Sequence, residues 1–282
     1  MPRLLLIVTL LVLFCASAQA QASRSARSYF NRANERYSKG DLDGAIADFD
    51  VAITFDPSLA RAYNNRGNAR LERGDLEGAL TDYDRAIELT PRFAEAYANR
   101  GNARQAKADL DGAIADFTEA ILINPRLDRA YFNRGNARYA KGQLDSAISD
   151  YDSAIKINPR SEQSYSNRSN ARRAKGDIEG AIADCDRAIR LNPQLAEAYN
   201  NRGAARAERK DFAGAIADYD RAIQVQPRLA MAYANRGLAR LIQGHSGEAR
   251  ADFSQAIRLD GNLKRLIDER TGDVERRLGL KR

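Results

Sequence analysis

Small and apolar residues recur along this chain of 282 residues with the spacing of a helix. Alanine occurs in pairs seven residues apart, first at Ala45 and Ala52 and last at Ala249 and Ala256. Larger apolar residues lie one and four positions after the first alanine of nearly every pair. This arrangement forms one face of an α-helix and differs from the strict alternation of a strand. The pattern therefore predicts a chain built from amphipathic helices.

The pattern repeats with a fixed period of 34 residues, which prolines mark most clearly. Apart from Pro2, they are Pro57, Pro91, Pro125, Pro159, Pro193 and Pro227. A tyrosine recurs with the same spacing from Tyr29 to Tyr233, and positions 1–34 are numbered here from three residues before it. The resulting repeats 1 to 7 are 26–59, 60–93, 94–127, 128–161, 162–195, 196–229 and 230–263. A period of this length is typical of stacked helix-turn-helix units.

Each repeat is expected to contain two helices, at positions 1–14 and 16–30. Position 15 is glycine in five repeats, as at Gly40, and glycine favours the end of a helix. Position 16 is aspartate in five repeats, as at Asp41, which can cap the next helix. The proline at position 32 ends the second helix, because it cannot continue the hydrogen-bonding pattern.

The combination of an aromatic residue at position 4, a small one at 8, alanine at 20 and 27, an aromatic at 24 and proline at 32 resembles the tetratricopeptide repeat (TPR) family. The resemblance covers residues 26–263. It implies antiparallel helix pairs stacked into a right-handed superhelix, with the first helices lining a concave groove. We therefore expect an all-α solenoid of seven units over residues 21–263, followed by a C-terminal capping helix over 264–282. That helix could be continuous or broken near Gly272.

Arginine departs from the family pattern, because it fills two positions where TPR proteins usually have apolar residues. Position 7 is Arg32, Arg66, Arg100, Arg134, Arg168, Arg202 and Arg236, and position 11 is Arg36, Arg70, Arg104, Arg138, Arg172, Arg206 and Arg240. Position 23 is aspartate throughout, from Asp48 to Asp252, and position 25 is aspartate in five repeats. Buried charges need opposite charges nearby. We expect a ladder of arginine–aspartate pairs within and between repeats.

Asparagine is a poor helix former, yet it is frequent on the first helices. Position 6 is Asn31, Asn65, Asn99, Asn133, Asn167, Asn201 and Asn235, and position 9 includes Asn34, Asn68, Asn102, Asn136 and Asn170. In some TPR superhelices a position-6 asparagine binds the backbone of an extended peptide, so the resemblance implies a peptide in the groove. The alternative is that these amides bond to neighbouring repeats and set their packing. Both interpretations stay open, the second especially for position 9.

Selectivity would come from the variable positions 2, 5, 12 and 13. The candidate groove residues there are Phe30, Phe132, Tyr37, Tyr139, Arg61 and Arg129. Repeat 7 is more apolar, with Met231, Leu238, Leu241 and Ile242. These residues could contact a ligand, or they could pack under the capping helix.

The N-terminus has the features of a signal peptide over residues 1–20. Arg3 precedes an apolar run at residues 4–14, and Ala18 and Ala20 form a small-x-small motif that predicts cleavage before Gln21. The run is too short for a stable membrane span, although an uncleaved anchor is the alternative. We expect a periplasmic or secreted protein without a membrane span after cleavage. The formal net charge is +7, but the charges are interspersed, which does not favour nucleic acid as a partner.

No pattern of catalytic or cofactor-binding residues is evident. His245 is the only histidine, and Cys185 replaces an aromatic core residue at position 24. The sequence has no phosphate-binding loop and no metal-ligand spacing. We therefore expect a non-enzymatic scaffold without a cofactor that binds a peptide or partner protein in its groove. The alternative is a structural component of the envelope that self-associates or bridges other proteins through its convex face and ends.

Overall fold

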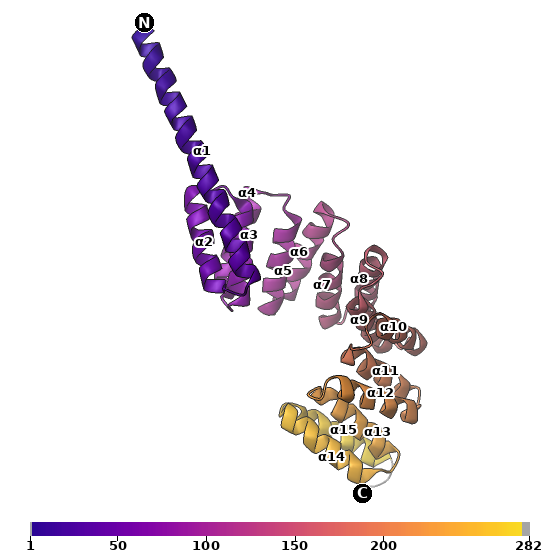
Figure 1. Ribbon diagram of the computed structural model, residues 1–282. Helices are drawn as coiled ribbons and strands as arrows, with labels where there is room; N and C mark the ends of the chain where they lie inside the picture. Colours follow the sequence, from indigo (N-terminus) through magenta and orange to yellow (C-terminus); the bar gives the residue numbers. More distant parts are fainter. Residues whose placement is uncertain (1, 278–282) are drawn as a thin grey trace. The chain divides into compact units, whose positions relative to one another are not determined.

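The computed structural model describes residues 2–277, including the side chains from Gln19 onward except those of residues 275 and 277. Within this part of the chain there are fifteen α-helices and no strand (Figure 1). The prediction of an all-α solenoid is confirmed. The chain divides into two compact units, Met1–Ala137 and Arg138–Arg282, and the division falls inside helix α7.

The first unit is a stack of helix pairs in which each helix contacts its neighbours along the chain. Its helices are α1 (Pro2–Ser38), α2 (Leu42–Phe55), α3 (Ala60–Glu72), α4 (Leu76–Leu89), α5 (Ala94–Ala106), α6 (Leu110–Ile123) and most of α7 (Asp128–Ala140). Helices α1, α3 and α5 are the first helices of repeats 1 to 3, and each packs against the second helix of its own repeat. The second helices α2 and α4 pack against α3 and α5 of the next repeats, and Ile121 of α6 lies in one cluster with Ala130 of α7, which makes the core continuous.

The second unit has the same construction and ends with an additional helix. It contains α8 (Leu144–Ile157), α9 (Glu162–Ala174), α10 (Ile178–Leu191), α11 (Ala196–Glu208), α12 (Phe212–Val225), α13 (Ala230–Ile242), α14 (Ser246–Leu259) and α15 (Leu263–Arg277). Helices α9, α11 and α13 are the first helices of repeats 5 to 7 (Figure 1). Helix α15 is the capping helix, and it runs unbroken through Gly272, so the alternative of a break there is wrong.

The turns between the two helices of a repeat follow the sequence prediction. Gly142 has φ +73°, and the side chain of Asp41 accepts a hydrogen bond from the Gly44 amide at 3.0 Å. In the two repeats without glycine at position 15, Ala108 and Lys210 take the same left-handed conformation, with φ of 61° and 67°. These two residues carry strain that glycine would avoid.

Helix α1 is longer than expected, because it begins at Pro2 and not near residue 26. Residues 3–39 contain neither glycine nor proline and are rich in alanine and leucine, so nothing in the sequence ends a helix before residue 26. The side chains of residues 1–18 lie outside the described residues. The signal peptide and its cleavage site remain predictions.

Small residues at position 8 allow the two helices of a repeat to approach closely. A Cβ atom added to Gly203 would lie 2.7 Å from the Cε1 atom of the Tyr219 ring, and Gly67 stands in the same relation to Tyr83. Both rings are almost completely buried. The aromatic residue at position 24 therefore occupies the space that a side chain at position 8 would need.

The apolar residues of repeat 7 mostly pack under the capping helix. Leu241 is buried in a cluster with Leu263 and Ile267 of α15, and Met231 and Leu238 pack against the same cluster. Packing under the capping helix, the alternative to ligand contact, is confirmed for Leu241 and Met231, whereas Leu238 packs there and also lines an open cleft on α11 and α13.

Candidate peptide-binding surface

The arginine at position 7 joins the two helices of its own repeat. In repeat 6, Nε and Nη2 of Arg202 donate to the two carboxylate oxygens of Asp218 at 3.0 and 2.6 Å. The same two-pronged contact occurs between Arg66 and Asp82. It also joins Arg32 with Asp48, Arg100 with Asp116, Arg168 with Asp184 and Arg236 with Asp252.

The remaining nitrogen of the same guanidinium reaches the preceding repeat. Nη1 of Arg202 donates to Asp186 of repeat 5 at 2.6 Å, and Nη1 of Arg236 donates to Asp220 of repeat 6 at 2.6 Å. In repeat 3, position 25 is Thr118, whose hydroxyl accepts from Arg134 at 3.0 Å. One planar fork thus binds carboxylates of two adjacent repeats, a geometry that suits arginine and not lysine.

The arginine at position 11 completes the surroundings of the buried carboxylate. Nη1 of Arg206 donates to Asp218 at 2.8 Å and to the Gly214 carbonyl at 3.3 Å. The aspartates at position 23 are only 1% to 4% exposed, and two guanidiniums offset the cost of burying each charge. The shared carboxylate also offsets the repulsion between arginines four residues apart. The predicted ladder of ion pairs is confirmed, and it uses these arginines for structure.

The ring of the tyrosine at position 4 lies against the guanidinium of the position-7 arginine. The guanidinium carbon of Arg202 lies 5.6 Å from the centre of the Tyr199 ring, and the equivalent pair is present in all seven repeats. Burial lowers the pKa of Arg202, but the hydrogen bonds to Asp218 and Asp186 outweigh it and raise the pKa above its ordinary value. The guanidinium is therefore permanently charged.

The asparagines at position 6 bond to the preceding repeat through their amide nitrogen. Asn65 donates to Asn34 at 2.7 Å and Asn133 to Asn102 at 2.7 Å, both at position 9. The other contacts go to position 5: Asn99 to Asn64 at 2.9 Å, Asn201 to Ser166 at 3.2 Å and Asn235 to Asn200 at 3.0 Å. These bonds support the interpretation that the amide nitrogens set the packing of repeats.

The residue at position 5 decides which partner is used. Where it is asparagine or serine, as in repeats 2, 5 and 6, it accepts the bond. Where it is Phe30 or Ala98, the bond goes to the asparagine at position 9 instead. The sequence contained this signal, but position 5 was considered only as a groove position and its acceptors Asn64, Ser166 and Asn200 were missed.

The position-9 asparagines have a structural role where their contacts are defined. Asn34 and Asn102 accept from the next repeat, and Asn68 accepts a hydrogen bond from the Tyr83 hydroxyl at 2.8 Å. Asn136 and Asn167 are half-buried, whereas Asn31 is exposed. The position-6 side chains from Asn65 to Asn235 are all half-buried, so each keeps some contact with solvent.

The aromatic and arginine candidates lie in different surroundings. Phe30 packs on Phe49, with 5.9 Å between ring centres, and belongs to the core of repeat 1. The Tyr37 hydroxyl donates to Glu72 of repeat 2, and burial together with this contact raises the pKa of Tyr37 to about 12. Phe132 is half-buried. The exposed candidates are Tyr139, Arg61 and Arg129.

An open cleft lies on the first helices of repeats 6 and 7. One part, of about 230 Å³, is lined by Ala204, Ala207, Asn235, Leu238 and Ile242, which occupy positions 9, 12, 6, 9 and 13. A second part, of about 480 Å³, shares Ala207, Leu238 and Ile242 with the first and reaches Val274 of α15. The cleft in the second unit is therefore lined by residues at positions 6, 9, 12 and 13, and Asn235 is the one predicted groove residue among them.

Charged residues stand around this apolar cleft. Arg173, at position 12 of repeat 5, bonds through Nη1 to Glu208 of repeat 6, and Arg270 of α15 lines the same space. The Nε atom of Arg173 is buried and has no hydrogen-bond partner within the described residues. Sequence reasoning missed Arg173 because position 12 is tyrosine, leucine or glutamine in the repeats of the first unit.

In the described part of the chain, no group of three or more histidine, cysteine, aspartate or glutamate side chains is arranged to hold a metal ion. In the same part of the chain, no helix combines the length and apolar character that crossing a membrane requires. Cys185 is buried and contacts Ser169.

Comparison with known families gives matches along most of the chain. A family model described as TPR repeat matches residues 33–72, 67–107 and 169–208. Two models described as tetratricopeptide repeat match residues 128–161 and 196–229, and residues 94–127 and 230–263. No curated protein sequence is similar enough to this chain to count as a match.

Solved structures with similar folds are numerous. A tetratricopeptide repeat protein from Parabacteroides merdae has a TM-score of 0.70 at 21% identity, covering 89% of this chain and 99% of that one. YrrB, described as a TPR protein with an unusual peptide-binding site, has a TM-score of 0.55 at 24% identity, covering 65% and 95%. MamA has a TM-score of 0.54 at 25% identity, covering 61% and 94%. The first two likenesses concern the fold alone.

Proposed function

Because this chain belongs to the tetratricopeptide repeat family, we propose that it is a non-catalytic scaffold whose first helices bind an extended segment of a partner protein. The observation that carries the proposal is the open cleft on α11 and α13, lined by Ala204, Ala207, Leu238 and Ile242. The same helix positions would face a ligand in the other repeats. The peptide-binding site attributed to YrrB, a protein of the same fold, supports the proposal.

The chemistry of the cleft suits a peptide with an apolar side chain. Ala204 and Ala207 leave room that Asn at position 9 and Tyr at position 12 occupy in other repeats. Leu238 and Ile242 provide apolar walls. Asn235 is half-buried at its edge, and its amide can donate to or accept from a peptide backbone. The ligand would therefore place a side chain in the cleft and its backbone along the asparagines.

We also propose that the protein acts outside the cytoplasm, in the periplasm or after secretion. The proposal rests on the N-terminal sequence, in which an apolar run and an Ala-Gln-Ala motif precede Gln21. Mass spectrometry of protein purified from the envelope and the medium tests it. A mature chain that begins at Gln21 supports export, and an intact N-terminus in the cytoplasm contradicts it.

A pair of matched variants tests the groove. Ala207→Tyr places in the cleft a residue that position 12 already carries at Tyr37 and Tyr139, so the fold should accept it. Ala217→Tyr adds the same ring at an exposed position of α12 and serves as the control. Each variant and the wild type would be crosslinked in the envelope and purified with its partners. Partners lost only with Ala207→Tyr would support the groove, and partners kept by both variants would exclude it.

A second measurement separates the two roles of asparagine. Asn99 bonds to Asn64 through its amide nitrogen, so Asn99→Ala removes one packing contact, at a cost of about 1 kcal/mol. If asparagine only sets the packing, Asn99→Ala lowers the melting temperature and leaves partner capture unchanged. If it also binds peptide, the Asn99/Asn133/Asn167→Ala variant loses its partners at a temperature where circular dichroism shows an intact fold.

A further inference from the structure

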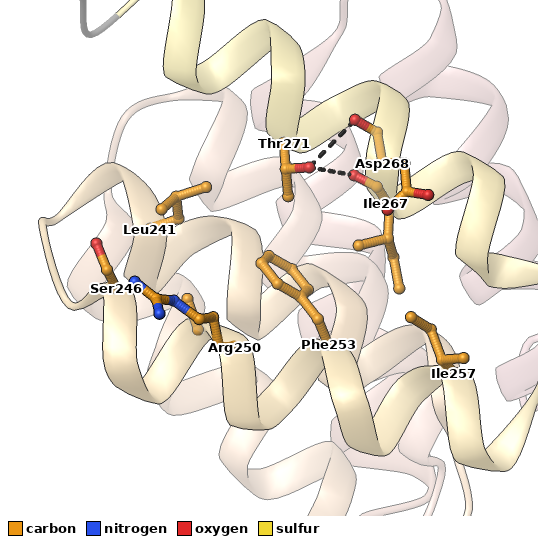
Figure 2. A pocket seen from close by; sticks show the side chains of 9 residues that line it. Leu241, Ser246, Arg250, Phe253, Ile257, Ile267, Asp268 and Thr271 are labelled. Carbon is orange, nitrogen blue, oxygen red and sulfur yellow. Dashed lines mark hydrogen bonds between the residues drawn. The ribbon is translucent and has the colours of Figure 1, made fainter. Parts of the chain in front are cut away.

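The end of the solenoid contains a second cleft, between α14 and α15, which the groove does not include. Its volume is about 410 Å³, within the range of roughly 300–1,000 Å³ that is usual for ligand pockets. Figure 2 shows Phe253 and Ile257 of α14 on one side and Ile267 and Thr271 of α15 on the other, with Arg250 and Ser246 at one end. This cleft stays open, whereas the second helix of an interior repeat is covered by the first helix of the next repeat.

Interior repeats close because the first helix of each of repeats 2 to 7 brings an alanine at position 10. Ala103 packs on Ala79 and Tyr83 of repeat 2, and Ala239 packs in the same way on repeat 6. These alanines are buried, and they let the incoming helix lie directly on the preceding second helix. Helix α13, for example, contacts α12 far more than α11.

Helix α15 cannot approach α14 in this way. Its residue at the equivalent position, 34 residues after Ala239, is Asp273, which is exposed and paired with Arg276. Because a carboxylate is not buried against an apolar helix without a partner, α15 lies mainly against α13 and less against α14. Phe253 is consequently 9% exposed, compared with 2% for Tyr219 at the same position of repeat 6.

The charges beside the cleft are not balanced. Position 21 is Ile or Leu in repeats 1 to 6 but Arg250 in repeat 7, at the mouth of the cleft. The acidic groups nearby are already paired, since Asp268 contacts Lys264 at 2.8 Å and Glu248 contacts Arg240 at 3.2 Å. Within the described residues Arg250 itself forms no ion pair, and its exposed guanidinium stands next to apolar walls.

From this arrangement we propose that the α14–α15 cleft binds an acidic peptide segment that carries a large apolar side chain. The side chain enters between Phe253, Ile257 and Ile267, and a neighbouring carboxylate of the peptide pairs with Arg250. The site is distinct from the groove on α11 and α13, so a partner could bind the end of the solenoid independently of the groove.

The test uses fluorescence anisotropy with the full chain and a capped, fluorescein-labelled peptide, Gly-Ser-Asp-Phe-Asp-Leu-Gly-Ser. Arg250→Glu should weaken binding at least about tenfold, because it reverses the charge at the mouth. Arg258→Glu, an exposed arginine on the same helix outside the cleft lining, should change binding by no more than about twofold. A peptide with Lys in place of Asp should bind no better to the wild type than to Arg250→Glu.

A second variant tests the cleft without changing charge. Thr271→Phe places a ring in the open space, and circular dichroism with a thermal melt verifies that the variant is folded. This variant should weaken binding of the same peptide at least about tenfold, because the ring occupies the cleft. Equal weakening by Arg250→Glu and Arg258→Glu, or full binding by Thr271→Phe, would overturn the proposal, as would the absence of saturable binding to the wild type.

Discussion

The Sγ atom of Cys185 lies 3.2 Å from the Oγ atom of Ser169, and both side chains are buried between the two helices of repeat 5. In repeat 6 the same two positions hold Gly203 and Tyr219, whose ring fills the space beside the glycine. Repeat 5 therefore exchanges a small residue and a ring for two residues of intermediate size. The two positions thus face each other between the helices in both repeats, although the residues differ.

This relationship predicts a reciprocal effect of two substitutions. Cys185→Tyr alone should destabilise the protein by about 1–3 kcal/mol, because the ring meets the Ser169 side chain. Adding Ser169→Gly should recover most of that loss, since the double variant recreates the pair seen in repeat 6. Urea denaturation of the wild type, both single variants and the double variant measures the coupling. Additive single effects would show that the two positions do not share one space.

The buried thiol should be unreactive in the folded protein. Burial raises the pKa of Cys185 from 9.0 to about 12, and the thiolate is the reactive form. At pH 8, iodoacetamide should modify Cys185 only after unfolding in urea. A pKa raised by folding stabilises the protein fully below pH 9, and this contribution declines as the pH rises towards 12. Alkylation of the native protein at the rate of a free thiol would contradict the assignment.

The two carboxylates held by Arg202 should differ in their importance. Asp218 is 3% exposed and is bound by both Arg202 and Arg206, so Asp218→Ala leaves two guanidiniums without their buried carboxylate partner. We expect a loss of about 3–5 kcal/mol. Asp186 holds the same arginine at the surface, and Asp186→Ala should cost at most about 1 kcal/mol. Urea denaturation of both variants measures the two losses in the free energy of unfolding. Equal losses would show that Asp218 contributes no more than a surface carboxylate.

Two residues with positive φ offer a gain in stability. Lys210 has φ 67° at a position that is glycine in five other repeats. Lys210→Gly should stabilise the protein by about 0.5–1 kcal/mol, because relief of the left-handed strain exceeds the entropy cost of glycine. Gly142→Ala, the reverse change at the same position of repeat 4, should destabilise it by a similar amount. In thermal melts, the melting temperature should rise for Lys210→Gly and fall for Gly142→Ala.

The regular features of the fold were accessible from the sequence because they repeat. A 34-residue period fixes which residues share a helix, and the glycine and aspartate between the helices determine where each one ends. The ion pairs were also predictable, since arginine at two apolar positions required an acidic partner. The start of α1 was missed because no residue between Arg3 and Lys39 ends a helix.

The candidate site was harder to predict, because one residue type serves two roles. An asparagine on a helix surface has the same sequence signal whether it faces a ligand or the next repeat. The hydrogen-bond partner depends on position 5 of the preceding repeat. Phe30 cannot accept, so Asn65 donates to Asn34 at position 9. Asn64 can accept, so Asn99 donates to it directly. The cleft between α14 and α15 depends on Asp273, whose effect appears only when α15 is placed against α13 and α14.

The contact of each position-7 arginine with two repeats also bears on how such a chain can change in length. Arg202 binds one aspartate in its own repeat and one in the repeat before it, and Arg236 binds the equivalent pair, Asp252 and Asp220. A copied unit inserted after repeat 5 or 6 would meet the same pair of carboxylates at both of its borders. The gene could therefore gain or lose segments of 34 codons at these junctions without any compensating substitution.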